Sequence, residues 1–286
     1  MTYVPNFGVL LFGGRDAGKE LNDTWQFNGQ KWTQLHLKVA PPARQGAYLV
    51  YDPVDNYSVL FGGSNRTAYL NDTWMFQNSS WHQLHPTDSP PGMRAYAMTW
   101  DAADGYVLLF GGHGGSEIFK QADYTFNNQT WSFLEGAWTE IPTAVAPPVR
   151  SEPSLGEIPN GPVVLFGGWN IDSPHYYKAL NDTWTYSAGV WTQLNLTTAP
   201  SPRDGATMTY DPVLQALVIF GGHNGNINYN QTWEFSPGEN WTLLATVGSP
   251  PAMNAQAMVF FPTVGGDILF GGVVTKMPLR QTWLLV

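Results

Sequence analysis

The stretch Leu60-Phe61-Gly62-Gly63, followed by Asn71-Asp72-Thr73-Trp74 and by Trp81, recurs along the whole chain. Its first part, a hydrophobic residue, Phe and two Gly, occurs six times, with gaps of 49, 49, 56, 54 and 50 residues between copies. The second glycine of each copy falls at Gly14, Gly63, Gly112, Gly168, Gly222 and Gly272. Self-similarity at a nearly fixed period predicts a repeat architecture.

Tryptophan follows the same period. Each tetrad is followed by an Asn-x-Thr-Trp, with Gln281-Thr282-Trp283 as a degenerate last copy, and the first five copies have a second tryptophan seven or eight residues later. These positions account for 11 of the 13 tryptophans, at Trp25, Trp32, Trp74, Trp81, Trp131, Trp138, Trp184, Trp191, Trp233, Trp241 and Trp283. The repeat is therefore rich in large aromatic residues at fixed spacing, as short packed strands require.

Four short strands are expected in each copy. In the second copy they cover residues 47–51, 57–61, 72–76 and 81–84, separated by turns at Asp52-Pro53, at Gly62-Gly63 and at residues 77–80. The pattern predicts an antiparallel meander. Because one such sheet cannot bury both faces alone, the sheets must stack face to face and close into a ring. We expect an all-β chain, a six-bladed β-propeller of four-stranded antiparallel blades, with residues 1–286 as a single domain.

Composition excludes several classes of protein. With 286 residues, 43% of them hydrophobic and 12% charged, the chain is too apolar for disorder. It has no cysteine, which removes disulfides, thiolate metal sites and cysteine nucleophiles. The net charge of −9 argues against binding to nucleic acid or to an anionic membrane surface. The apolar runs have only strand length, so we expect no membrane insertion by this segment.

The double glycine after a hydrophobic strand, with tryptophans spaced after it, resembles the kelch repeats. The resemblance covers essentially the whole chain, and the Leu-Phe-Gly-Gly and Asn-Asp-Thr-Trp variants are more similar to kelch arrays of secreted microbial proteins than to intracellular adaptors. It implies a propeller whose ligands bind at the loops between strands two and three and at the segments between blades. Kelch-type copper radical oxidases need a Tyr-Cys cross-link, which a chain without cysteine cannot form.

The two ends of the chain depart from the repeat. Residues 1–5 align with residues 208–212, so the first copy begins at the end of its first strand, and Val286 precedes any fourth-strand tryptophan of the last copy. We expect the first and last blades to be incomplete and the chain to be a fragment, a processed form or a reading frame whose start was assigned too late, which leaves room for a seventh blade outside it.

Two repeated features have structural explanations. The double glycine supplies positive φ angles and bare backbone against which the tryptophan of a neighbouring blade packs. The Asp or Asn before Thr-Trp is expected to cap the turn into the third strand through local side-chain hydrogen bonds.

Four of the seven arginines share a register in the segments between blades, 18 or 19 residues before the second glycine of their copy. They are Arg44, Arg94, Arg150 and Arg203, and Asn254 takes the place in the last full copy. Resemblance to intracellular kelch adaptors implies a basic pocket for acidic ligands, and guanidinium groups suit carboxylates, uronic acids and sulfates. The alternative is that each arginine ties its own inter-blade loop to backbone carbonyls.

The loops after the double glycine vary in length, and those at 113–129 and 169–180 are the longest. The second of them holds a cluster suited to stacking on sugars or burying a peptide side chain: Trp169, Asn170, His175, Tyr176 and Tyr177. The alternative is that Trp169 packs on the adjacent blade under the tyrosines. His113 and His223 share one register, but no carboxylate or third histidine falls there, so we expect neither a metal site nor a cofactor.

Several sequons lie outside the repeat. Asn65, Asn78 and Asn195 are the glycosylation candidates, and with the scarcity of lysine and the absence of cysteine they favour an extracellular or cell-surface protein.

Two functions remain open from the sequence. The first is a non-catalytic recognition or structural module that binds a protein or an acidic or glycan ligand through its loop face. The second is a sugar-modifying enzyme similar to the sialic-acid mutarotases among kelch proteins, in which the four arginines would hold a carboxylate and Glu117, His113 or His223 would move protons. Nothing resembles a Ser-His-Asp set or a phosphate loop.

Overall fold

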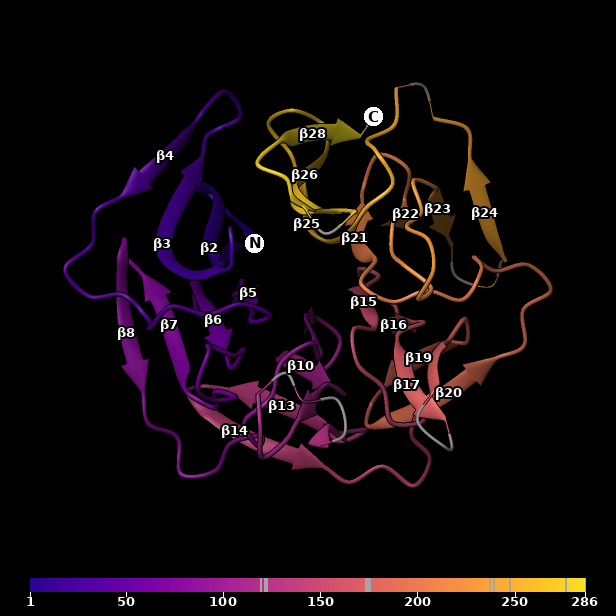
Figure 1. Ribbon diagram of the computed structural model, residues 1–286, viewed down its shortest axis with the longest axis horizontal. Coiled ribbons are helices and arrows are strands. Elements are labelled where there is room, and N and C mark those ends of the chain that lie inside the picture. Colours follow the sequence, from indigo (N-terminus) through magenta and orange to yellow (C-terminus); the bar gives the residue numbers. More distant parts are fainter. Residues whose placement is uncertain are drawn as a thin grey trace. The chain divides into compact units, whose positions relative to one another are not determined.

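The computed structural model describes residues 1–118, 120, 123–172, 176–236, 238, 240–246, 248–275 and 277–285. The chain is all-β, with the six antiparallel blades of a β-propeller fold (Figure 1). Contacts divide it into two compact units of three blades each: residues 1–100 with 105–142, and residues 101–104 with 143–286. The single-domain organisation stays a prediction. No helix in the described part is long and apolar enough to span a membrane.

The first unit contains blades one to three. Its strands are β1 (Thr2–Val4), β2 (Gly8–Asp16), β3 (Lys19–Phe27) and β4 (Trp32–Leu35); β5 (Tyr48–Asp52), β6 (Tyr57–Phe61), β7 (Thr73–Gln77) and β8 (Ser80–Leu84); and β9 (Ala97–Asp101), β10 (Tyr106–Phe110), β13 (Thr130–Leu134) and β14 (Ala137–Ile141). A short ladder of β11 (His113–Gly114) and β12 (Thr125–Phe126) extends the loop between β10 and β13.

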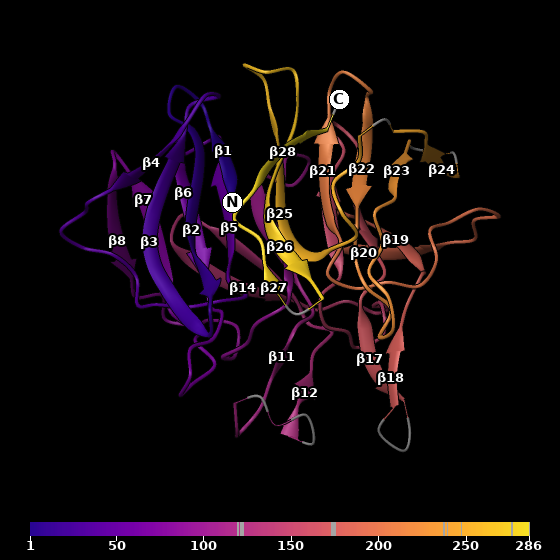
Figure 2. The same cartoon turned by 45° about the horizontal axis from the view of Figure 1, so that its top comes forward.

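The second unit contains blades four to six. Its strands are β15 (Ser154–Glu157), β16 (Val163–Phe166), β19 (Thr183–Ser187) and β20 (Val190–Leu194); β21 (Thr207–Asp211), β22 (Ala216–Phe220), β23 (Thr232–Phe235) and β24 (Trp241–Leu244); and β25 (Asn254–Phe261), β26 (Gly266–Val274), β27 (Met277–Pro278) and β28 (Thr282–Leu285). The hairpin of β17 (Trp169–Asp172) and β18 (Tyr176–Ala179) projects beyond its own blade (Figure 2).

The strands predicted for the second copy lie within one residue of β5 to β8. The prediction for the first blade needs a correction, because β1 is present: its three residues pair with Gly8, Val9 and Leu10, which makes this blade four-stranded. In the last blade, β25, β26 and β28 take the places of strands one to three. The fourth strand of this sheet, β27, pairs with the C-terminal end of β26, and no strand follows β28 among the described residues.

The fourth-strand tryptophans join neighbouring blades within each unit. Trp81 packs between Phe76 of its own blade and Phe12 of the preceding blade, with ring centroids 5.0 and 5.2 Å away. Its indole donates a 3.0 Å hydrogen bond to the hydroxyl of Thr24, the threonine of the preceding Asn-x-Thr-Trp. Trp138 bonds Thr73 and Trp241 bonds Thr183 in the same way. The repeated threonine and tryptophan thus form one inter-blade contact, with the hydrophobic core around it.

The double glycine has the expected positive φ angles, +56° at Gly62 and +88° at Gly63. The expectation that a tryptophan packs on it is wrong. A Cβ on Gly62 would lie 3.0 Å from the carbonyl oxygen of Met93, and one on Gly63 would lie 2.8 Å from that of Gln45. The glycines therefore let backbone approach backbone, which is why side chains are excluded there.

Candidate functional site

The loops between strands two and three and the segments between blades lie at the same end of each sheet, because the strands form a meander. At this end the residue after the double glycine pairs with one residue of the preceding inter-blade segment. Four such pairs form isolated bridges: Gln45 with Ser64, Arg94 with His113, Ser151 with Trp169, and Asp204 with His223. We call the inter-blade members of these pairs, Gln45, Arg94, Ser151 and Asp204, the bridge positions.

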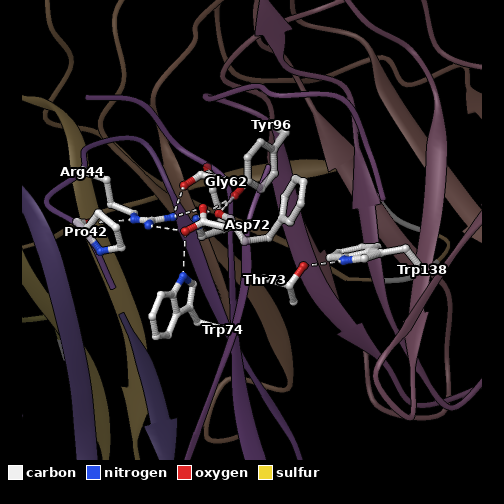
Figure 3. Close-up of polar contacts among 10 residues, drawn as sticks. Pro42, Arg44, Gly62, Asp72, Thr73, Trp74, Tyr96 and Trp138 are labelled. Atoms are coloured by element: carbon white, nitrogen blue, oxygen red, sulfur yellow. Dashed lines mark hydrogen bonds and ion pairs between the residues drawn. The ribbon is translucent and has the colours of Figure 1, made fainter. Parts of the chain in front are cut away.

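Arg44, one residue before a bridge position, is buried with a 1% exposed fraction (Figure 3). Its Nε donates to the carbonyl of Pro42 at 2.9 Å, Nη1 donates to that of Gly62 at 2.9 Å, and both terminal nitrogens reach the carboxylate of Asp72 at 2.6 and 2.7 Å. The same carboxylate accepts the indole N–H of Trp74 at 2.7 Å. Four of the five guanidinium N–H groups are thus engaged inside the protein.

These contacts stabilise the ionised form of Asp72. Burial alone raises the pKa of Asp72, but the hydrogen bonds and charge of Arg44 and the hydrogen bond from Trp74 outweigh it, and the pKa lies below its ordinary value. Asp182 shows the same balance with Arg150 and Trp184. Arg150 is fully buried and repeats the four hydrogen bonds of Arg44 at 2.7 to 3.0 Å.

Arg203 occupies the equivalent place in the fifth blade with a neutral partner. Its guanidinium donates to the carbonyls of Ser201 and Gly221 and to the side-chain oxygen of Gln231, and it lies 4.1 Å from the ring centre of Tyr229. Burial lowers the pKa of Arg203 to about 10. With Arg44 and Arg150, this geometry favours the structural alternative, in which the guanidinium groups bind their own loop and not a ligand.

The register assigned to Arg94 needs a correction. The carbonyls of Arg44 and Arg203 accept the N–H of Gly14 and Gly168, and the residue that does the same for Gly63 is Met93, not Arg94. Met253 takes this place before the sixth blade, where it accepts from Gly222. Arg94 and Asn254 therefore follow the arginine position and belong with the bridge positions. Counting back from the double glycine assigned Arg94 to the wrong register, because the number of residues between the arginine position and the double glycine varies by one between copies.

The partners of the arginines were missed by the sequence analysis, which expected the Asp before Thr-Trp to cap a turn. A signal existed within the chain. Asp stands in this place where an arginine precedes the blade, in the Arg44–Asp72 and Arg150–Asp182 pairs, whereas Gln129 and Gln281 stand where Met93 and Met253 precede it. In these four blades a buried arginine and its carboxylate are present or absent together, in keeping with the cost of an unpaired buried charge, whereas Arg203 before the fifth blade is paired with the neutral Gln231.

His113, the first residue of β11, lies in an enclosed, cationic environment. It is fully buried, stacks on Tyr124 with centroids 4.4 Å apart, and its Nε2 accepts a 3.2 Å hydrogen bond from Nε of Arg94. Burial, with a smaller contribution from Arg94, lowers the pKa of His113 to about 3. The imidazole is therefore buried and is neutral near pH 7.

His223 has the opposite environment. Its side chain is 30% exposed, and Nδ1 lies 3.2 Å from the amide nitrogen of Gly225 and 3.8 Å from the carboxylate of Asp204. The interaction with Asp204 raises the pKa of His223, and Glu152 adds to it. The hydroxyl of Tyr177 donates to the other oxygen of Asp204. Asp204, which the sequence analysis did not single out, is 4% exposed.

The hairpin β17–β18 is held onto the fifth blade by this cluster. Tyr177 stacks on Trp169 at 5.3 Å and meets His223 edge to face at 6.0 Å, and a Cβ on Gly225 would lie 2.7 Å from the Tyr177 ring. We call Trp169, Tyr177, Asp204 and His223 the hairpin cluster. Trp169 and Tyr177 thus pack inward, in agreement with the alternative in which Trp169 packs on the adjacent blade under a tyrosine.

Part of β18 is accessible. Tyr176 has an exposed fraction of 71%, and the half-buried Asn170 donates a 3.2 Å hydrogen bond to the carbonyl of Val149. His175 lies outside the described residues. The corresponding loops of the next two blades also present apolar side chains, Ile227 at 55% and Met277 at 67%.

The remaining candidates are scattered. Glu117 is exposed and pairs with Lys120 at 3.0 Å. Asn78 and Asn195 are exposed, while the side-chain oxygen of Asn65 accepts from the backbone of Thr67 and Ala68. Over the residues that the structure describes, no three His, Asp or Glu side chains come together as a metal would require.

A family model described as the KLHDC2/KLHL20/DRC7 Kelch-repeats domain matches residues 1–149, slightly more than half of the chain. No curated protein sequence matches. The match contains the first three copies of the repeat, including the Arg44–Asp72 pair and the Trp81–Thr24 and Trp138–Thr73 contacts. With six copies of the same motif and six antiparallel blades, the chain belongs to the Kelch-repeat family.

Proposed function

We propose that the chain is a non-catalytic recognition module that binds a protein ligand through the loops between strands two and three of blades four to six. Kelch propellers generally serve as protein-interaction modules. The observation that carries the proposal is the exposure of Tyr176, Ile227 and Met277 in the loops between strands two and three of three consecutive blades. Large apolar residues gathered on one surface mark interaction sites on soluble proteins.

The hairpin cluster supports this proposal because it gives the exposed Tyr176 a fixed base. Tyr177 is bonded to Asp204 and stacked on Trp169, so Tyr176 is presented by a packed hairpin. A rigid aromatic side chain loses little conformational entropy on binding, which favours affinity.

The environment of His223 favours a ligand that carries an acidic group. Its ring is partly exposed and its pKa is raised by Asp204, so the protonated form, a cation on this loop face of a chain of charge −9, is stabilised. This cation takes the place that the sequence analysis gave to the arginines. A glycan ligand, an extracellular or cell-surface setting and glycosylation at Asn65, Asn78 and Asn195 remain proposals, and the sequons, the scarcity of lysine and the absence of cysteine support the setting.

The test selects binding peptides from a display library on the folded chain and then measures their affinity for point variants. Tyr176→Ser and Met277→Ser should each weaken binding about tenfold, the effect of losing one well-packed anchor. Val190→Ser and Val213→Ser are matched controls, since both residues are exposed but lie at the other end of their sheets, Val190 as the first residue of β20 and Val213 in the turn between β21 and β22. The proposal fails if the loop variants bind as tightly as the parent while the controls lose affinity.

The sugar-modifying enzyme remains a second candidate because of one observation, the pairing of His223 with Asp204, which is how a proton-transferring histidine is oriented. The arginines assigned to hold a sugar carboxylate are engaged at Arg44, Arg150 and Arg203. An NMR anomerisation assay with sialic and uronic acids decides: a rate above that in buffer, lost in His223→Ala, supports the enzyme, and a rate equal to buffer removes it.

A further inference from the structure

The loop between β22 and β23 of the fifth blade contains an Asn-Gly dipeptide. In such a pair the backbone nitrogen of the glycine can attack the side-chain carbonyl carbon of the asparagine, because glycine has no side chain that obstructs the close approach. The dipeptide occurs three times in the chain, at Asn28-Gly29, Asn160-Gly161 and Asn224-Gly225. The third of these pairs differs from the other two in what surrounds the attacking nitrogen.

The amide nitrogen of Gly225 has a base beside it. Its N–H donates a 3.2 Å hydrogen bond to Nδ1 of His223, so this ring nitrogen is placed to accept the proton that the amide must lose on attack. Asp204, whose carboxylate lies 3.8 Å from the same Nδ1, stabilises the imidazolium that the proton transfer forms. Asp204, with a smaller contribution from Glu152, also raises the pKa of His223, which makes the neutral ring a stronger base than an ordinary histidine.

The side-chain amide of Asn224 is held and polarised by its own loop. Its Oδ1 accepts the backbone N–H groups of Asn226 and Ile227, each at 3.0 Å. Its Nδ2 donates to the hydroxyl of Tyr229 at 2.9 Å. Two backbone donors on one carbonyl oxygen stabilise the negative charge that develops on it during attack. The loop therefore supplies both a base for the nucleophile and donors for the electrophile.

Asn28-Gly29, in the turn between β3 and β4, provides a comparison because it has the same local geometry without the base. Its asparagine Oδ1 also accepts the N–H groups of the second and third residues after it, each at 3.0 Å. The φ angle of its glycine is +96°, against +93° at Gly225. The residue before the asparagine is Phe27 in place of His223. In the pair at 160–161 the glycine N–H donates to a backbone carbonyl, which is not a base.

We propose that Asn224 is a self-modification site, at which the loop converts its own asparagine into aspartate or isoaspartate with His223 as the general base. The nitrogen of Gly225 gives its proton to Nδ1 of His223 and forms a bond with Cγ of Asn224. The bond between Cγ and Nδ2 then breaks, and this nitrogen leaves as ammonia with the proton from the imidazolium. Water opens the resulting succinimide ring at either of its two carbonyls.

The modification changes the charge of the loop face of the fifth blade. It places a carboxylate next to His223, in the loop that presents the exposed Ile227. On a surface that favours an acidic ligand, this negative charge opposes binding. The reaction itself needs no ligand, so it can be tested independently of the proposed function.

The test incubates the folded chain in water enriched in the heavy oxygen isotope and follows Asn224 and Asn28 by peptide mapping with mass spectrometry. Only residues converted during the incubation carry the label, so conversion during digestion is not counted. We expect Asn224 to be converted at least about tenfold faster than Asn28, the effect of a positioned general base. Isoaspartate should be among the products, because direct hydrolysis of the amide would give aspartate alone. In the urea-unfolded chain the two asparagines should react at similar rates.

His223→Gln removes the base and should lower the rate at Asn224 to that at Asn28. His82→Gln, which replaces an exposed histidine of the second blade, should leave both rates unchanged. If His223→Gln does not fold, the parent supplies a second measurement. The ratio of the two rates should fall as the pH decreases through the folded pKa of His223, because a protonated Nδ1 cannot accept the amide proton.

The proposal is overturned if Asn224 in the folded parent is converted no faster than Asn28, or if no isoaspartate is formed. It is also overturned if the folded His223→Gln variant keeps the rate of the parent, or if the ratio of the two rates in the parent does not change with pH.

Discussion

The second and third blades share strands, tryptophans and double glycines, yet they place their arginine differently. Before the second blade, Arg44 is buried against Asp72 and Gln45 takes the bridge position. Before the third blade, Met93 is buried in place of the arginine, Gln129 replaces the aspartate, and Arg94 is the bridge residue beside His113.

A shift of one residue therefore moves a cation from the interior ion pair to the end of the sheet where the loops lie. The repeat motif therefore fixes the backbone positions, whereas the side chain at the bridge position determines the electrostatic environment of the residue after the double glycine. Arg94 opposes His113, which stays neutral, whereas Asp204 opposes His223, which is stabilised as a cation.

The largest expected effect comes from converting the second blade toward the third. Arg44→Met should lower the free energy of unfolding by about 4 kcal/mol, because it leaves the Asp72 carboxylate without its cation. The double variant Arg44→Met with Asp72→Gln should return to within about 1 kcal/mol of the parent, because it recreates Met93 and Gln129 and a buried pair is replaceable by neutral groups. Urea unfolding of the three proteins measures this. Equal destabilisation of the single and double variants would contradict the interpretation.

The next effect is acid destabilisation through His113. Its folded pKa of about 3 lies below the ordinary value of 6.5, so its contribution to stability is complete above pH 6.5 and is lost as the pH falls. The loss is about 1.4 kcal/mol per pH unit, or about 3 kcal/mol between pH 6.5 and 4.5. Unfolding curves across this range provide the measurement.

His113→Gln is the control for this effect, since it removes the titrating group from the same buried place. Its stability should vary less over the same pH range. If the free energy of unfolding changes with pH by the same amount in the parent and in the variant, His113 is not the source of the acid destabilisation.

Much of the fold followed from the sequence because it depends on repetition. The period located six blades, and the turns at Asp52-Pro53 and Gly62-Gly63 placed strands within one residue of those observed. The pairing of Trp81 with Thr24 was not foreseen, since it joins side chains of different blades whose register is set by packing. The short β1 was underestimated because only three of its residues pair.

The candidate site was less predictable. Spacing in the sequence identified Arg44, Arg150 and Arg203 correctly but misplaced Arg94. The distance to the double glycine varies by one residue between copies, so the register is known only from the backbone pairing. Asp204 carries no motif and is recognisable only from its position opposite His223. Trp169 and Tyr177 were identified, but their inward packing depends on the turn at Gly225 in the next blade.

A smaller effect extends the comparison to the fifth blade, where Arg203 faces the neutral Gln231. Gln231→Asp should raise the free energy of unfolding by about 1 kcal/mol, because it supplies the carboxylate that Arg44 and Arg150 already have. Gln129→Asp is the matched control and should destabilise, since Met93 offers no charge and Glu140 is bonded to Gln129. Thermal unfolding compares them, and a gain in both variants would refute the dependence on arginine.

The smallest effect concerns Asp204. Asp204→Asn should lower the pKa of His223 toward its ordinary value of about 6.5 by removing the attraction to the imidazolium, with a change of less than 1 kcal/mol in stability because the ring is partly exposed. A raised histidine pKa stabilises the fold below pH 6.5 and stops doing so as the pH rises through the folded value. NMR titration gives the pKa directly. An unchanged pKa in the variant would show that Asp204 does not control His223.

The most direct test of the central claim, that the bridge position decides the environment of the residue after the double glycine, is one NMR titration of His113 and His223 in the intact chain. We expect the His113 resonances to remain those of a neutral imidazole at every pH from 8 down to the onset of acid unfolding. The His223 resonances should change with a midpoint above the ordinary histidine pKa of about 6.5. Titration of both histidines with the same midpoint, or His113 above His223, would contradict the claim.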